Sequence, residues 1–261
     1  GDLELEDLRP EQPDAARLRD LFVELEFRVL VEKYTQAVTA AGTVSVNPTP
    51  AGTDYRVVTS VEGVQELVYA VRERGWVSVD VELSGADPMR ASLVGMSFAV
   101  NEGEAYYLPF GHRPPGELAL GEAFQVLPNL PSLENESVAP LRDLLEDPTV
   151  RKIGQDLKRD LVALSNLGVE LAGIWFDTMV ASYVLDPGRR AHTLEALALD
   201  ILAHKTTALA EVIGRGQKQV SFGEVTLESA CDYACEDTDF TLRLYHRFQP
   251  ELEQQQMEGL F

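Results

Sequence analysis

Asp80 and Glu82 are the residues of this sequence that most directly suggest chemistry, because they stand two positions apart in an otherwise apolar segment. Residues 76–82 read Trp-Val-Ser-Val-Asp-Val-Glu, and this alternation predicts a strand with valines on one face and both carboxylates on the other. Two such carboxylates on a core strand repel each other and are costly to desolvate. A divalent cation held by oxygen ligands would neutralise them. An edge strand with a solvated acidic face is the alternative, and the pair alone leaves both open.

Two helical segments carry further acidic residues that could join this pair. Asp156 and Asp160 are four residues apart, so a helix would place them on one face. Tyr233 and Asp237 have the same spacing near the end of the chain. Taken singly, each helical pair is more often a solvated face than a site. The order of the three motifs, a strand Asp-x-Glu, a helical Asp and a helical Tyr-x-x-x-Asp, favours one shared site.

That order resembles the 3′–5′ proofreading exonuclease domain of bacterial DNA polymerase I, a member of the tyrosine-containing branch of the DEDD nucleases. The similarity runs from about Tyr55 to Pro250. It is carried by residues 79–82, 92–99, 154–160, 176–179, 183–185, 194–197, 204–206 and 233–237. The family usually has Thr at the position of Val81, a change we expect to be tolerated. It usually has Asn at the position of Asp156, whose added negative charge is expected to weaken DNA binding or change the metal stoichiometry. A wedging Leu of the family is replaced by Ala86, so the grip on a 3′ end is expected to be weaker here.

The flanking segments also resemble parts of such polymerases. Residues 18–30 are similar to the helical connector that follows the 5′-nuclease part, and 249–261 to the first residues of a polymerase domain. We therefore expect an N-terminal helical arm and linker at 1–52, the exonuclease domain at 53–249 and the start of a truncated polymerase domain at 250–261. Gly1 stands where an initiating Met would be, which agrees with an excised piece of a longer chain.

The resemblance implies roles for five residues. The catalytic and metal-binding carboxylates would be Asp80, Glu82, Asp160 and Asp237. Asp80 would bridge two divalent ions, Glu82 and Asp237 would hold the ion that activates water, and Asp160 would serve the other. Tyr233 would hydrogen-bond the attacking water and orient it. Hard oxygen ligands favour Mg²⁺ or Mn²⁺, and two such ions about 3.5–4 Å apart can generate the nucleophile and stabilise the leaving oxygen.

The implied substrate is a single-stranded or frayed DNA 3′ end, from which nucleoside 5′-monophosphates would be released. Gln155, Asp156 and Lys158 lie close to Asp160 in the sequence and are candidate contacts to the strand.

A second candidate contact is the basic, glycine-containing segment 214–219, which includes Arg215 and Lys218. The segment would contact phosphate. A solvated loop is an equally good interpretation of it.

The net charge of −21, from 43 acidic and 22 basic residues, argues against strong duplex binding by this chain alone. It does not argue against a metal-dependent nuclease, and a polymerase domain of the same parent chain would supply most of the grip on DNA. Two other functions stay open: a catalytically silent scaffold domain, and an RNA 3′ exonuclease of the ribonuclease D type.

The periodicity predicts six strands, at 55–59, 76–82, 91–100, 105–109, 151–153 and 173–176. It predicts helices at 13–28, 30–41, 61–74, 137–146, 156–167, 177–185, 192–202 and 224–251. This order indicates an α/β domain with a mixed sheet. The resemblance implies a ribonuclease-H-like fold, with a central mixed sheet of about five strands flanked by helices.

Cys231 and Cys235 are four residues apart on one predicted helix, where a disulfide would have poor geometry, so we expect free thiols and a reducing cytoplasm. No apolar run approaches the roughly 20 residues of a membrane span. We expect a monomer in the bacterial cytoplasm, associated with the nucleoid and without a membrane partner.

Overall fold

The computed structural model describes residues 17–18, 21–22, 30, 34, 52–114 and 127–261. The predicted arm and linker at 1–52, the helices at 13–28 and 30–41 and the connector at 18–30 therefore lie outside the described residues, except at these few positions.

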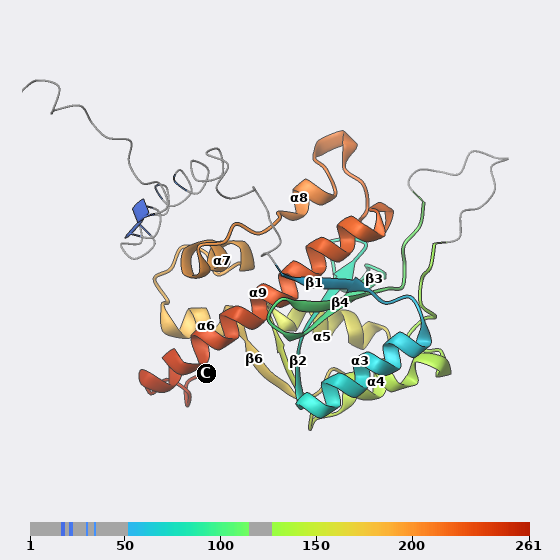
Figure 1. Ribbon diagram of the computed structural model, residues 1–261, viewed down its shortest axis with the longest axis horizontal. Coiled ribbons are helices and arrows are strands. Elements are labelled where there is room, and N and C mark those ends of the chain that lie inside the picture. The colour runs from blue at the N-terminus through green and yellow to red at the C-terminus, as the bar shows by residue number, and fades with distance from the viewer. Residues whose placement is uncertain (1–16, 19–20, 23–29, 31–33, 35–51, 115–126) are drawn as a thin grey trace, which may run out of the picture.

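A six-stranded mixed sheet forms the centre of the fold, in the order β1-β4-β3-β2-β5-β6 (Figure 1). Its strands are β1 (Asp54–Val57), β2 (Trp76–Leu83), β3 (Leu93–Asn101), β4 (Glu104–Pro109), β5 (Arg151–Gly154) and β6 (Ile174–Asp177). β2 pairs antiparallel with β3 and parallel with β5. All six strands predicted from the periodicity are confirmed, each boundary within two residues, and the family expectation of about five strands is one too few.

β2 is a central strand, so the edge-strand interpretation of its acidic residues is wrong. Val77, Val79 and Val81 are at most 1% exposed and pack in an apolar core on one face of the sheet. Val81 is fully buried in this core. The carboxylates of β2 lie on the opposite face.

Helices cover both faces of the sheet (Figure 1). The valine face packs against α3 (Val61–Arg74), α4 (Ala139–Glu146) and α5 (Leu157–Asn166). The other face packs against α9 (Leu227–Gln254), which in turn contacts α6 (Thr178–Leu185) and α7 (Leu194–Leu202). The short elements are α8 (Leu209–Val212) and the 3₁₀ turns at Glu136–Val138, Gly216–Lys218 and Phe222–Glu224.

Capping side chains explain why several helices begin later than predicted. Asp177 accepts the backbone N–H of Met179, Thr193 that of Ala196, and Thr226 that of Ser229. These residues precede α6, α7 and α9, whose starts were predicted at 177, 192 and 224. An oxygen-bearing side chain before the first turn satisfies backbone donors that have no partner within the helix.

The end of α9 bears on the predicted boundary between residues 249 and 250. The helix runs through that boundary to Gln254 without a break, with Pro250 inside it. The ring of Phe261 then packs against Phe176 of β6, with ring centroids 4.7 Å apart. Residues 250–261 therefore pack against the same core as the rest of the described chain.

Candidate active site

Asp80 and Glu82 lie side by side on the sheet face covered by α9. Glu82 is only 6% exposed. Burial raises the pKa of Asp80, and burial followed by the charge of Asp80 raises the pKa of Glu82 well above its ordinary value.

Asp160 comes from the first turn of α5 and is 1% exposed. Its Oδ2 atom has no hydrogen-bond partner among the described residues. Burial, and next the charge of Asp80, raise the pKa of Asp160 well above its ordinary value. A buried carboxylate oxygen without a partner is costly, so this atom is poised for a ligand that the protein does not supply.

Local packing fixes where α5 begins and hence where Asp160 lies. The carboxylate of Asp177 accepts the backbone N–H of Leu157 at 2.8 Å, at the first residue of the helix. The side chain of Leu157 occupies the space that a Cβ at Gly154 would need, so a larger residue at 154 would displace it. The sequence Gly-x-x-Leu before Asp160 therefore allows the close packing of Leu157 on Gly154 at the turn from β5 into α5.

α9 supplies Tyr233 and Asp237 from one face, as their spacing predicted. Tyr233 is 8% exposed. Burial, and then the charges of Asp237 and Glu82, raise the pKa of Tyr233. Burial, and then the charges of Asp80 and Glu82, raise the pKa of Asp237 well above its ordinary value. The structure therefore brings the five predicted residues together from β2, α5 and α9.

We call Asp80, Glu82, Asp160 and Asp237 the carboxylate cluster. In the part of the chain that the structure describes, no three His, Cys, Asp or Glu side chains are disposed to hold a metal ion. The donor set itself, four carboxylates with an unpartnered Asp160 oxygen, fits a hard divalent cation.

Arg159 also belongs to the site, although the sequence analysis did not single it out. Its Nη1 atom lies 3.3 Å from the backbone oxygen of Val81 and 4.0 Å from Oδ1 of Asp160. Its charge opposes the rise in pKa of Asp80, Glu82 and Asp160. The only signal in the sequence is a cation beside an acid, which is common on helix surfaces.

Three of the predicted substrate contacts flank the start of α5. Gln155 is already engaged, since its Nε2 donates to the backbone oxygen of His192 at 2.7 Å and its Oε1 accepts from Thr178. Asp156 precedes the helix in a left-handed conformation, with φ of 58°, so the prediction that it shares a helix face with Asp160 is wrong. Lys158 is exposed.

The other two predicted contacts, Arg215 and Lys218, lie on the turn that contains Gly216–Lys218 and are exposed. The described structure shows no ion pair between either side chain and the carboxylate cluster. It therefore leaves both residues as candidates for contact with a substrate.

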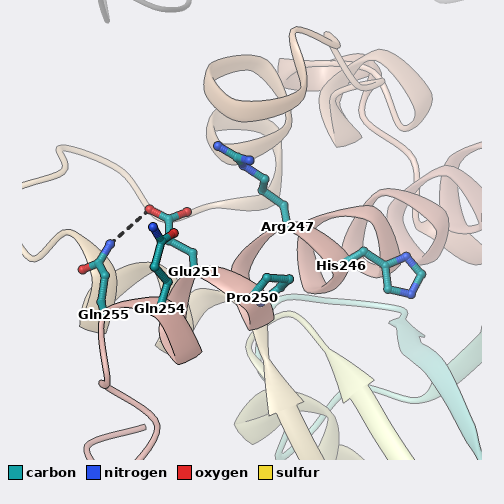
Figure 2. A pocket seen from close by; sticks show the side chains of 6 residues that line it. All are labelled: His246, Arg247, Pro250, Glu251, Gln254 and Gln255. Carbon is teal, nitrogen blue, oxygen red and sulfur yellow. Dashed lines mark hydrogen bonds between the residues drawn. The ribbon is translucent and has the colours of Figure 1, made fainter.

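A surface pocket of about 500 Å³ lies further along α9 (Figure 2). Its described lining residues are His246, Arg247, Pro250, Glu251, Gln254 and Gln255. At a rise of about 1.5 Å per residue, His246 is roughly 13 Å along the helix from Asp237, and Gln254 roughly 25 Å. The pocket is therefore separate from the carboxylate cluster.

Cys231 and Cys235 are free thiols, as predicted. Both are buried on α9, and their sulfur atoms are 3.8 Å apart. Among the described helices, none combines the length and apolar character that crossing a membrane requires.

Comparison with known proteins places this geometry in a family context. A family model described as 3′–5′ exonuclease matches residues 55–253. DNA polymerase I of Pseudomonas aeruginosa is 35% identical over 257 residues, which cover 97% of this chain and 27% of that protein. DNA polymerase I of Chloroflexus aurantiacus is 29% identical over 94% of this chain and 24% of that protein. The chain thus spans about a quarter of the length of these relatives.

Solved structures with the same fold include two ribonucleases. Escherichia coli RNase D, described as an exoribonuclease involved in structured RNA processing, superposes with a TM-score of 0.55 at 19% identity, covering 77% of this chain and 46% of that one. Trypanosoma brucei RNase D in complex with RNA U12 gives 0.58 at 16% identity, covering 77% and 65%. At these identities the likeness shows the fold, and it confirms the predicted ribonuclease-H-like architecture.

Proposed function

The chain belongs to the 3′–5′ exonuclease family found in DNA polymerase I, and we propose that it is the proofreading part of such a polymerase. It would remove nucleoside 5′-monophosphates from DNA 3′ ends by two-metal-ion phosphodiester hydrolysis. The observation that carries this proposal is the convergence of Asp80, Glu82, Asp160, Asp237 and Tyr233 from three separate elements onto one buried site.

The carboxylate cluster would hold two divalent ions, Mg²⁺ or Mn²⁺. Bound there, they would supply a nucleophilic hydroxide and stabilise charge on the phosphate. The protein's contribution is to bring four carboxylates from β2, α5 and α9 into one buried site, where their charges act on one another. The pKa values of these groups are raised by desolvation and by mutual repulsion, and bound cations would relieve both.

Tyr233 would orient the attacking water. Its ring packs against Phe222, with centroids 5.8 Å apart, and its hydroxyl lies within the influence of the Asp237 charge. Because burial and neighbouring negative charge raise the pKa of Tyr233, the hydroxyl stays protonated over the working pH range and remains a hydrogen-bond donor. A donor with a fixed direction selects one orientation of a water molecule beside the phosphate.

DNA is the proposed substrate because the identified relatives are DNA polymerases. The substrate contacts we propose are Gln155, Asp156, Lys158, Arg215 and Lys218. At a net charge of −21 the chain holds DNA poorly by long-range attraction, so we propose that a polymerase domain of the parent chain delivers the frayed 3′ end.

The proposed organisation is an arm and linker at 1–52, an exonuclease domain at 53–249 and the start of a truncated polymerase domain at 250–261, with α9 crossing the last boundary to end at Gln254. We propose a monomer that works in the bacterial cytoplasm at the nucleoid.

The test is degradation of a 5′-labelled single-stranded DNA in Mg²⁺ or Mn²⁺, beside a matched RNA and an Asp80→Ala control. We expect a 3′-shortening ladder on DNA that EDTA and the substitution abolish. A stronger ladder on RNA would identify the ribonuclease D type of function instead. No ladder from this chain, and none when it is joined to a polymerase domain, would identify a silent scaffold.

A further inference from the structure

Arg159 is a positively charged side chain beside the carboxylate cluster, where the proposed chemistry requires divalent metal ions to bind. It is the third residue of α5, one position before Asp160, and its side chain is 36% exposed. The guanidinium reaches across to β2, where Nη1 donates to the backbone oxygen of Val81, the residue between the two strand carboxylates. One nitrogen thus lies near two of the three elements that carry the carboxylate cluster, β2 and α5.

This position has a consequence for the charge of the site. The four carboxylates carry four negative charges when ionised, and two divalent ions would cancel them. Arg159 adds one positive charge beside the carboxylates, and its charge opposes the negative charge of Asp80, Glu82 and Asp160. Without a phosphate, this charge would repel divalent cations at the cluster, and the negative charge of a phosphodiester would offset that repulsion.

An arginine side chain has enough donors to contact the protein and a substrate phosphate at the same time. A guanidinium carries five N–H donors in a planar fork and stays charged at any working pH. Both contacts described above use Nη1 alone. Among the described residues Nε and Nη2 have no hydrogen-bond partner, so both would be available to the oxygens of a phosphate, for which the guanidinium fork is well matched.

We propose that Arg159 is a positioning residue that couples metal binding to substrate binding: its charge weakens the hold of the carboxylate cluster on divalent ions until a phosphodiester is present. The inference rests on the proposed function and adds a regulatory property of the same site. Coupling of this kind is reciprocal, so metal should strengthen the binding of DNA by the same factor as DNA strengthens the binding of metal.

The experiment measures Mn²⁺ binding to the whole chain by calorimetry or by the spin-resonance signal of free Mn²⁺, without DNA and with an uncleavable phosphorothioate oligonucleotide. Arg159→Gln should bind Mn²⁺ about tenfold more tightly than wild type without DNA, and the gain in affinity on adding the oligonucleotide should shrink by a similar factor. Arg159→Lys keeps the charge and should resemble wild type. Arg90→Gln removes an equal charge from a side chain that is 88% exposed and should change little.

The direction of the change in Mn²⁺ affinity distinguishes an effect of the Arg159 charge from a structural effect of the side chain. If Arg159 only braced α5 against β2, its loss would loosen the cluster, and Mn²⁺ affinity would fall instead of rise. Equal or weaker binding by Arg159→Gln, with the variant folded by circular dichroism, would overturn the inference and leave the proposed function in place. No Mn²⁺ binding by wild type or variant, with or without oligonucleotide, would overturn both.

Discussion

The carboxylate of Asp177 accepts the backbone N–H of Leu157 at 2.8 Å and also that of Met179 at 2.9 Å. One side chain therefore satisfies the first turns of two helices, α5 and α6. The interaction is favourable because a negative charge faces two helix N-termini. Since Asp160 is three residues beyond Leu157, this carboxylate also sets the position of a cluster member.

Asp177→Ala should lower the free energy of unfolding by about 2–3 kcal/mol, because two caps are lost together, and should reduce the exonuclease rate at least about tenfold. Urea unfolding and the labelled-DNA assay measure the two effects. Ser60→Ala removes the cap of α3, remote from the cluster, and should cost about 1 kcal/mol without changing the rate. Equal rates for both variants would show that Asp177 does not position Asp160.

Tyr233→Phe should lower the rate by about two orders of magnitude while leaving the fold intact, because only the orienting hydroxyl is lost. Tyr55→Phe is the matched control: it removes a hydroxyl that donates to Asp239 on the same helix at 2.8 Å, and it should leave the rate unchanged.

Tyr233 also determines an expected pH dependence of the exonuclease rate. Burial and the charge of Asp237 raise the pKa of Tyr233, so the wild-type rate should not fall through tyrosine ionisation below about pH 10. A decline in rate between about pH 8 and 9.5 that is absent from Tyr233→Phe would contradict the assignment.

The strands, and the placement of Asp80, Glu82, Tyr233 and Asp237 on their elements, could be predicted from the sequence because each depends on a local pattern, whereas Asp160 was assigned by the family resemblance. Period-two alternation around Asp80 and the four-residue spacing of Tyr233 and Asp237 survive folding unchanged. The position of Asp156 could not be predicted, since its left-handed backbone depends on Asp177, which accepts its N–H from 21 residues away. Arg159 was missed for a similar reason, because its contact with Val81 spans 78 residues.

Asp160→Asn should stabilise the metal-free protein near pH 7 by about 1–3 kcal/mol. Burial and the charge of Asp80 raise the folded-state pKa of Asp160, so the native state binds a proton that the unfolded state has released. Stability is therefore highest below about pH 4 for this group and falls as pH rises through the folded-state pKa.

Thermal unfolding with and without saturating Mn²⁺ tests this prediction. Asp160→Asn should unfold at a higher temperature than wild type without metal and should gain less from Mn²⁺, since a ligand is lost. Asp143→Asn changes an exposed acid on α4 and should match wild type in both conditions. A metal-free Asp160→Asn protein that is less stable than wild type would show that the carboxylate is stabilising as it stands.

Lys152 is a fully buried cation on β5, and Lys152→Met should stabilise the protein by about 1–3 kcal/mol near pH 7. Burial lowers the pKa of Lys152 to about 8, and its Nζ donates to the backbone oxygen of Asp147 at 2.6 Å. Removing the amine does not strand that oxygen, because it also accepts from the backbone N–H of Val150.

The lowered pKa of Lys152 determines whether this residue makes the free energy of unfolding rise or fall with pH. The folded protein releases the Lys152 proton near pH 8, whereas the unfolded chain keeps it to about pH 10.4, so wild-type stability should gain from this group as pH rises between those values. Lys152→Met should lack that gain, while Lys158→Met, at an exposed position on α5, should keep it. Urea unfolding at pH 7 and pH 9.5 measures the difference. Parallel pH profiles for wild type and Lys152→Met would show that the amine keeps its proton in the core.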